Sequence, residues 1–170
     1  QKVTDSFDRV AKNGDTVWLE ATYLPVVDKQ NKVFKIIKIA ANITKEHQQA
    51  ARQKSLLIAL DRSMATIEFH PDGTIINAND NFQKLMGYTL SEIQGKHHRM
   101  FCDDKFYQTH PNFWQQLANG EFKHGQFERR DSQGQSVWIE ATYNPIFDSD
   151  GKVQTIVKIG SNITDRIARN

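Results

Sequence analysis

The nine residues VWIEATYNP, from Val137 to Pro145, decide the fold, because nearly the same letters, VWLEATYLP, stand at Val17–Pro25. Shifting the chain by 120 residues aligns residues 7–44 with 127–164 without a gap, and 19 of those 38 positions are identical. This period is too long for a solenoid repeat and matches a small domain plus a linker. We therefore expect a tandem array, cut so that the chain holds the last part of one domain, a linker and one complete copy.

The composition argues against several classes of function. The chain carries 22 basic and 20 acidic residues, with no block of like charges that indicates a nucleic-acid-binding arm. Cys102 is the only cysteine, which excludes a disulfide framework and fits a reducing compartment such as the cytoplasm. No apolar run approaches the ~20 residues that span a bilayer, so we expect no membrane contact by this chain. Because it starts at Gln1 rather than Met, we expect a fragment of a longer protein.

The first half of the complete copy predicts a hairpin followed by short helices. Residues 64–78 contain two β-branched runs around a Pro-Asp-Gly turn. Asn79 can cap a helix that ends at Gly87, and Thr89-Leu90-Ser91-Glu92 has the form of a capping box. Two more short helices are expected, over residues 103–108 and from Pro111 to Gly120.

Three longer strands complete the copy, over residues 122–130, 135–147 and 152–163, with Asp- and Gly-containing turns between them. Two strands, several short helices and three strands with short connections predict one antiparallel sheet of five strands. The helices are then grouped on one face of this sheet, which makes the fold class α+β.

Specific segments resemble a PAS domain. They are NANDNFQKLMGYTLSEIQG at 77–95 and DSQGQSVWIEATYNPIFDSDGKVQTIVKIGSNIT at 131–164, whose Asn-Ile-Thr ending is similar to the family's Asp-Ile-Thr. The segments GKHHRMFC (95–102), FWQQL (113–117) and VWIEATYNP are closer still to tandem PAS domains of bacterial methyl-accepting chemotaxis proteins of the biofilm-dispersion and energy-taxis type.

This resemblance covers residues 63–165 in full and residues 3–44 as a truncated last part. It implies a cytoplasmic sensory and dimerisation module, with a chemoreceptor signalling domain following Asn170 in the full-length protein. The domain organisation expected is therefore a partial first domain at 1–44, a linker helix at 45–62, a complete domain at 63–165 and the start of an output helix at 166–170. The linker has high helix propensity, with Leu56, Leu57 and Leu60 as a narrow apolar stripe.

The resemblance also raises the question of a cofactor. In PAS domains that bind haem, an axial histidine typically comes from the region of His97 and His98, whereas His110 and His124 are weaker candidates. The alternative is that the pair caps a helix or packs at the domain edge, and adjacent residues on a helix cannot both face one cavity. Flavin is not expected, because the cysteine motif of light-sensing relatives is absent and Cys102 sits in MFCDD instead.

No recognised catalytic motif is present, so we do not expect an enzyme. A Cys102 dyad with His97 or His98 is the sole candidate, and proximity in sequence does not place a base beside a nucleophile. Aromatic and strand residues could line a ligand cavity or simply form the core: Phe82, Phe101, Phe106, Phe113, Trp114, Ile139, Ala141 and Tyr143.

Alternation along the central strand predicts two faces. Val137, Ile139, Ala141 and Tyr143 are expected in the core, and Trp138 is expected outside with Glu140. An exposed Trp indicates a cover, such as the helix before the domain or a second subunit.

Several other residues are candidates for signal relay or an interface. Glu140 is expected to pair with Lys158 across strands, and Asn162 and Thr164 can cap the output helix. The strands in 1–44 lack helices of their own, so they would pack in a homodimer, on the complete domain or on a missing part of the protein.

The sequence thus favours a sensory module that binds a small ligand or cofactor, of unknown identity, and changes the pose of its flanking helices. The alternative is a ligand-free dimerisation module.

Overall fold

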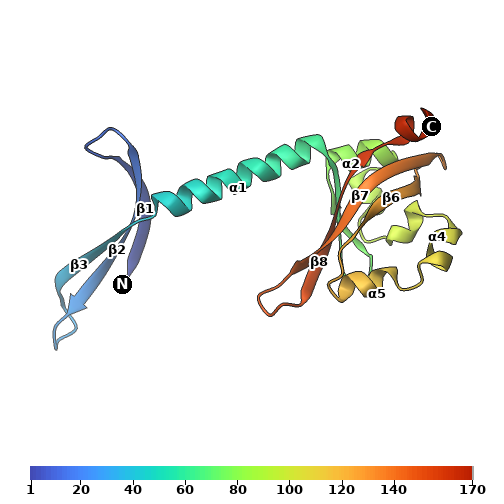
Figure 1. The fold of residues 1–170 in the computed structure, drawn as a ribbon. Helices are drawn as coiled ribbons and strands as arrows, with labels where there is room; N and C mark the ends of the chain where they lie inside the picture. The colour runs from blue at the N-terminus through green and yellow to red at the C-terminus, as the bar shows by residue number, and fades with distance from the viewer. Residues whose placement is uncertain (170) are drawn as a thin grey trace. The chain divides into compact units, whose positions relative to one another are not determined.

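The structure, a computed structural model, describes residues 1–169 and divides into two compact units. The first unit comprises residues 1–58 and the second begins at residue 59, so the division falls within a long helix, α1 (Thr44–Ser63). The expected linker helix is therefore present and extends one residue further at each end. Figure 1 shows α1 as one long helix.

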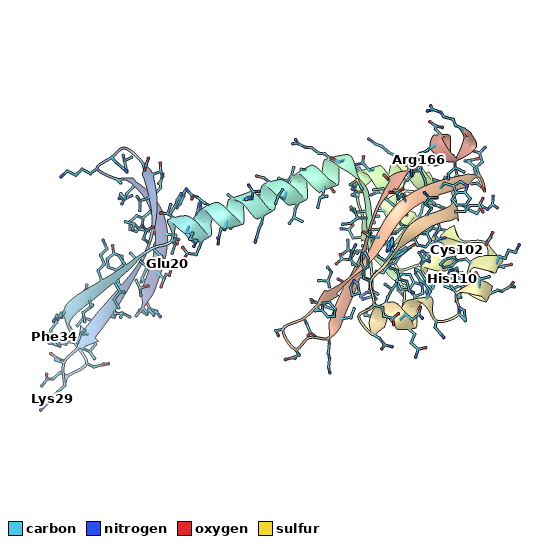
Figure 2. All side chains as sticks on the ribbon, viewed as in Figure 1. Glu20, Lys29, Phe34, Cys102, His110 and Arg166 are labelled. Carbon is cyan, nitrogen blue, oxygen red and sulfur yellow. The ribbon has the colours of Figure 1, made fainter. Side chains whose placement is uncertain are left out.

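The first unit is a three-stranded antiparallel sheet. Its strands β1 (Val3–Val10), β2 (Thr16–Val27) and β3 (Val33–Asn42) are adjacent in sequence order. Each pair is joined by a tight turn of Asp, Asn and Lys residues, as the turn chemistry predicts. In Figure 2, Lys29 and Phe34 lie at the far tip of this sheet.

The second unit contains the expected five-stranded antiparallel sheet, which confirms the α+β assignment. The strand order is β5-β4-β8-β7-β6, so the hairpin at the start of the domain pairs with its last strand. The strands are β4 (Ala65–Phe69), β5 (Ile75–Ala78), β6 (Lys123–Arg130), β7 (Ser136–Phe147) and β8 (Val153–Asn162).

Short helices connect β5 to β6 and form a layer beside the sheet (Figure 1). Asn79 caps the first of them by accepting a hydrogen bond from the Phe82 N–H, and Gly87 ends it with a positive φ of 74°. The Thr89 N–H donates to Glu92 Oε1 at 2.8 Å, half of the expected capping box. The helices are α2 (Asp80–Met86), α3 (Leu90–Ile93), the 3-10 turn η1 (His98–Phe101), α4 (Asp104–Thr109), α5 (Phe113–Ala118) and, after β8, α6 (Thr164–Arg169).

The core lies between this helical layer and one face of the five-stranded sheet. Ile139 and Tyr143 on β7 face it, together with Phe69 on β4 and Ile156 on β8. The alternation predicted for the central strand is therefore confirmed: Val137, Ile139, Ala141 and Tyr143 are buried.

The same strands have very different surroundings in the first unit. Ile156 is fully buried, whereas Ile36, its equivalent 120 residues earlier, is 65% exposed. Tyr143 is likewise buried, and its equivalent Tyr23 is 37% exposed. The core face of these strands is therefore largely exposed within this chain.

Across residues 1–169, no helix has both the length and the apolar character needed to cross a membrane.

Candidate functional site

The centre of the complete domain is a buried polar cluster surrounded by aromatic rings. His98, the first residue of η1, is fully buried. Its Nδ1 lies 2.7 Å from the Tyr107 hydroxyl, and its Nε2 lies 3.0 Å from the Tyr143 hydroxyl. The Phe113 ring stacks on the imidazole at 5.9 Å between centroids. Burial, reinforced by the positive charges of Arg129 and Lys158, holds the pKa of His98 well below its usual range.

Arg129 on β6 joins this cluster from the sheet. Its side chain is 1% exposed, and Nη2 donates to the Tyr143 hydroxyl at 3.0 Å. The guanidinium carbon lies 4.3 Å from the Phe106 ring centroid and 5.0 Å from that of Phe127, so two aromatic faces contact the cation. The Tyr143 hydroxyl therefore links an imidazole on one side to a guanidinium on the other.

Lys158 lies on the core face, which corrects the prediction that it pairs with Glu140 outside. Lys158 stands directly opposite Tyr143 in the β7–β8 register, and residues opposite each other share a face. Its side chain is 3% exposed, with Nζ 5.1 Å from the Tyr143 ring centroid. Burial lowers the pKa of Lys158 well below its usual range. The prediction failed because alternation along one strand does not reveal the register of the next.

The side chain of His97 has different hydrogen-bond partners from that of His98. Its Nδ1 accepts a hydrogen bond from the Arg99 N–H at 3.0 Å, and its Nε2 lies 2.8 Å from the Asp72 carbonyl oxygen. It thus caps η1, which is the alternative offered for this pair. As adjacent residues must, His97 and His98 face different ways.

Neither histidine suits an axial haem ligand. Ligation needs a free imidazole nitrogen facing an open cavity, and both nitrogens of each ring are within hydrogen-bond distance of another group. His98 is moreover surrounded by Phe69, Phe113 and Trp114. The residues present therefore do not fit haem in this conformation.

Cys102, the only cysteine of the sequence, lies beside this cluster in the helical layer (Figure 2). Its Sγ is 3.5 Å from His98 Nδ1, but that nitrogen also contacts the Tyr107 hydroxyl. Burial raises the pKa of the thiol, which disfavours the thiolate that a nucleophile needs. Within residues 1–169 no group of three or more His, Cys, Asp or Glu side chains is placed to hold a metal ion.

The eight residues proposed to line a pocket all belong to one packed cluster. Seven are buried, and Phe106 is partly buried against them. Of the eight, Phe106 and Phe113 contribute to hollows found on the surface of the described part of this unit. These residues therefore make up the core of the domain, which is the second of the two interpretations offered by the sequence.

The junction between β8 and α6 is closed by side-chain hydrogen bonds. Asn162 Oδ1 accepts from both the N–H and the hydroxyl of Thr164, at 2.9 and 2.6 Å. Thr164 Oγ1 accepts from the Trp138 N–H at 3.1 Å, and the Ile163 N–H donates to the Trp138 carbonyl oxygen. We call this arrangement of Asn162, Ile163, Thr164 and Trp138 the clasp.

The clasp occurs twice. In the first unit Asn42 Oδ1 accepts from the N–H and hydroxyl of Thr44, at 3.0 and 2.6 Å. The Trp18 N–H donates to Thr44 Oγ1 at 2.9 Å. The Trp18 ring also stacks on His47 of α1, with centroids 3.8 Å apart. The helix that follows the strands thus covers Trp18, and not one that precedes them.

Glu140 forms an ion pair with the output helix. Arg166 on α6 approaches Glu140 Oε2 at 2.6 Å, and both side chains are more than half exposed (Figure 2 labels Arg166). An exposed pair of this kind contributes only about 0–1 kcal/mol. Glu140 therefore lies on the outer face as predicted, with a different partner.

Sequence reasoning missed Arg129 and proposed Tyr107 only as one of the aromatic residues that could line a cavity. Tyr107 contacts His98 and accepts a hydrogen bond from the Trp114 indole N–H at 2.8 Å. A signal for Arg129 is present in the sequence, because Arg9 stands 120 residues earlier among the identical positions of the repeat.

Comparisons with known proteins identify the family and several relatives of this chain. A family model described as PAS fold matches residues 75–160, and one described as PAS domain matches residues 1–45. The biofilm dispersion protein BdlA of Pseudomonas aeruginosa is 44% identical over 164 residues, which are 95% of this chain and 39% of that protein. The aerotaxis receptor of Escherichia coli is 33% identical over 92 residues, 54% of this chain and 18% of that protein.

The oxygen sensor protein DosP of Escherichia coli is 24% identical over 161 residues, 91% of this chain and 19% of that protein. The chain thus spans less than half the length of each of these relatives. Among solved structures, a light-oxygen-voltage domain studied with a flavin analogue superposes with a TM-score of 0.58 at 22% identity, over 68% of this chain and 89% of that one. A PAS domain from Colwellia psychrerythraea gives 0.57 at 23% identity, over 67% and 98%. These two likenesses concern the fold alone.

Proposed function

Because the chain belongs to the PAS fold family, we propose that residues 63–165 are a sensory module of a cytoplasmic, chemoreceptor-like signalling protein. Residues 1–44 would be the last strands of a first such domain, and α1 and α6 would carry the signal along the chain. The 44% identity to a biofilm dispersion protein across 95% of the chain supports this proposal. The likeness to an aerotaxis receptor supports the same class of protein.

The observation that carries the proposal is the repeated clasp. In both units the start of the helix that leaves the sheet is held by the same three side-chain hydrogen bonds. One of the three comes from the backbone N–H of the tryptophan on β2 or β7. In the second unit β7 and β8 also carry the buried residues Tyr143 and Lys158. A change at the core face of these strands therefore has a short covalent and hydrogen-bonded path to α6. Helix displacement is a common form of bistable output.

The test is a chimera. Residues 1–170 are joined in helical register to a chemoreceptor signalling domain in a motile bacterium that lacks its own receptors, and the reversal frequency of swimming cells is recorded under changing oxygen and nutrient supply. We expect a stimulus-dependent frequency that Asn162→Ala abolishes without lowering the amount of protein. Ser161→Ala, which leaves the clasp intact, should respond as the parent does. Equal responses from Asn162→Ala and the parent would contradict the relay.

A second candidate function is a ligand-free dimerisation module. It is favoured by the packed core, in which His98 is already hydrogen-bonded at both nitrogens and stacked on Phe113. On this proposal the homodimer itself, and not an occupied cavity, sets the pose of α6. The chimera would then show a constant output that dilution, but no stimulus, changes.

A bound cofactor is tested by the absorption spectrum of the purified protein. We expect no Soret band, because the imidazole nitrogens of His97 and His98 are engaged, and no flavin absorbance. Addition of haemin to the apoprotein should give the same spectrum for the parent and for His98→Gln. A Soret band that only the parent forms would show that His98 leaves its tyrosine partners to bind iron.

A further inference from the structure

The core face of the complete domain holds two basic side chains and no carboxylate. Across residues 1–169 the buried polar side chains are His98, Arg129 and Lys158, so no buried Asp or Glu balances the two basic groups. Buried charges are normally paired, because removing an ion from water is costly unless an opposite charge replaces the solvent. Two buried basic groups without a carboxylate indicate that an anionic partner comes from outside the chain.

Arg129 also has an unused donor. Nη1 donates to the Glu128 carbonyl oxygen and Nη2 to the Tyr143 hydroxyl, each at 3.0 Å. Nε is buried and has no hydrogen-bond partner among the described residues. Native proteins rarely leave a buried donor unpaired. The planar guanidinium suits a carboxylate, which can accept from Nε and an adjacent Nη together.

Tyr143 lies between the two cations. Arg129 reaches its hydroxyl from β6, and Lys158 Nζ lies 5.1 Å from its ring centroid on the β8 side. An anion bound beside Tyr143 would thus be held from β6 and β8, the two strands that flank β7.

The internal repeat supports a function for this arrangement. Phe127, Arg129, Tyr143 and Lys158 have the identical residues Phe7, Arg9, Tyr23 and Lys38 at the same offset of 120. In the first unit Lys38 Nζ lies 5.8 Å from the Tyr23 ring centroid and 6.0 Å from that of Phe7. All four residues of the arrangement are therefore retained in both copies.

A groove on the surface leads to Arg129. It has a volume of about 300 Å³ and lies between α4 and the edge strand β6. Both carboxylates in its lining are already engaged, since Glu128 Oε2 accepts from Ser136 and Asp103 caps α4.

We propose that Arg129 and Lys158 bind the carboxylate of a small aromatic acid, whose ring packs against Phe106 and Phe127 at the inner end of this groove. The inference deepens the proposed sensory function and rests on it, because it names the class of ligand that the module would sense. Aromatic side chains flank the guanidinium on two sides, which favours an aromatic body over a bare inorganic anion.

The test is a binding measurement on the whole 170-residue chain by isothermal titration calorimetry at low salt. Benzoate is the probe, benzamide is its neutral isostere, and inorganic phosphate is the anion without a ring. We expect benzoate to bind at least tenfold more tightly than either. Equal binding of benzoate and benzamide, tighter binding of phosphate, or no binding of benzoate would each overturn the proposal.

Substitutions at the proposed site and at matched control positions test where benzoate binds. Arg129→Met should weaken benzoate binding at least tenfold, whereas Arg130→Met, the same change on the opposite face of β6, should leave it unchanged. Lys158→Met should also weaken benzoate binding, with Lys152→Met in the turn between β7 and β8 as its control. Without ligand, Lys158→Met should not lower the melting temperature, because it removes a buried unpaired cation. Equal losses in Arg129→Met and Arg130→Met would overturn the assignment.

The comparison of benzoate with benzamide uses the unmodified chain, so its result does not depend on whether any variant folds. It also involves no signalling output, so its failure is distinct from failure of the chimera. If benzamide binds as tightly as benzoate and the chimera still responds, the proposed sensory function stands and the proposed anion site is refuted.

Discussion

His98 lies in the middle of the aromatic core, where both of its ring nitrogens contact tyrosine hydroxyls and Arg129 and Lys158 lie nearby. A neutral imidazole satisfies this arrangement, and a protonated one would add a third positive charge. The folded-state pKa of His98 is therefore below the unfolded value of 6.5. The contribution of His98 to stability is complete above that pH and is lost as the pH falls towards the folded pKa.

We predict that stability decreases as the pH falls below 6.5 on account of this residue, because the unfolded chain then binds a proton that the buried imidazole does not. The measurement is urea unfolding at several pH values between 5 and 8. His98→Gln keeps a polar side chain without a titrating group, so its stability should vary less with pH over this range. Parallel curves for the parent and His98→Gln would contradict the neutral, buried imidazole.

Gly160 on β8 has no room for a side chain. A Cβ at this position would lie 2.6 Å from Ile139 Cγ2 and 3.1 Å from Ala141 Cβ. Overpacking of this kind costs about 1–3 kcal/mol, so Gly160→Ala should lower the free energy of unfolding by that amount. Gly125→Ala on β6 is the control, since its nearest contact would be an ordinary 3.5 Å. Chemical unfolding followed by tryptophan fluorescence compares the two.

Among the elements, the start of α6 depends on the clasp. Asn162 Oδ1 is the acceptor for the first helical N–H, at Thr164. Loss of such an acceptor costs roughly 1 kcal/mol, which corresponds to about fivefold faster opening of the helix. Asn162→Ala should accordingly speed amide exchange in the peptide covering residues 162–169, as measured by mass spectrometry. Ser161→Ala should leave the exchange rate unchanged, and an equal effect of both variants would contradict the clasp.

For the whole molecule, the uncovered face of the three-stranded unit is the feature that most affects assembly. Ile36 is 65% exposed, whereas Ile156 at the equivalent position is buried. Apolar sheet faces of this kind are normally covered. We predict a concentration-dependent homodimer that Ile36→Lys dissociates, observed by sedimentation velocity. Ile39→Lys, on the opposite face of β3, should retain the dimer. A compact monomer of the parent at every concentration would contradict this.

The tandem repeat, the succession of elements along the chain and the core face can be read from the sequence. The 120-residue repeat comes from self-comparison, and the turns with Asp and Gly and the alternation in VWIEATYNP are local patterns. They predict an α+β domain with a five-stranded sheet, a linker helix and the buried faces of Ile139 and Tyr143. All of these features are present in the structure.

The chemistry of the site depends on contacts between distant segments. Lys158 faces the core because the β7–β8 register sets it opposite Tyr143, and His98 is buried because η1 lies against the sheet that carries Tyr143. Arg129 reaches the same hydroxyl from a third segment. Register and long-range packing are set by the simultaneous burial of many side chains, so the pattern along any one strand does not contain them. The segment VWIEATYNP alone identifies the strand and its two faces. Only the folded domain shows that the basic side chains of Arg129 and Lys158 lie buried on the core side.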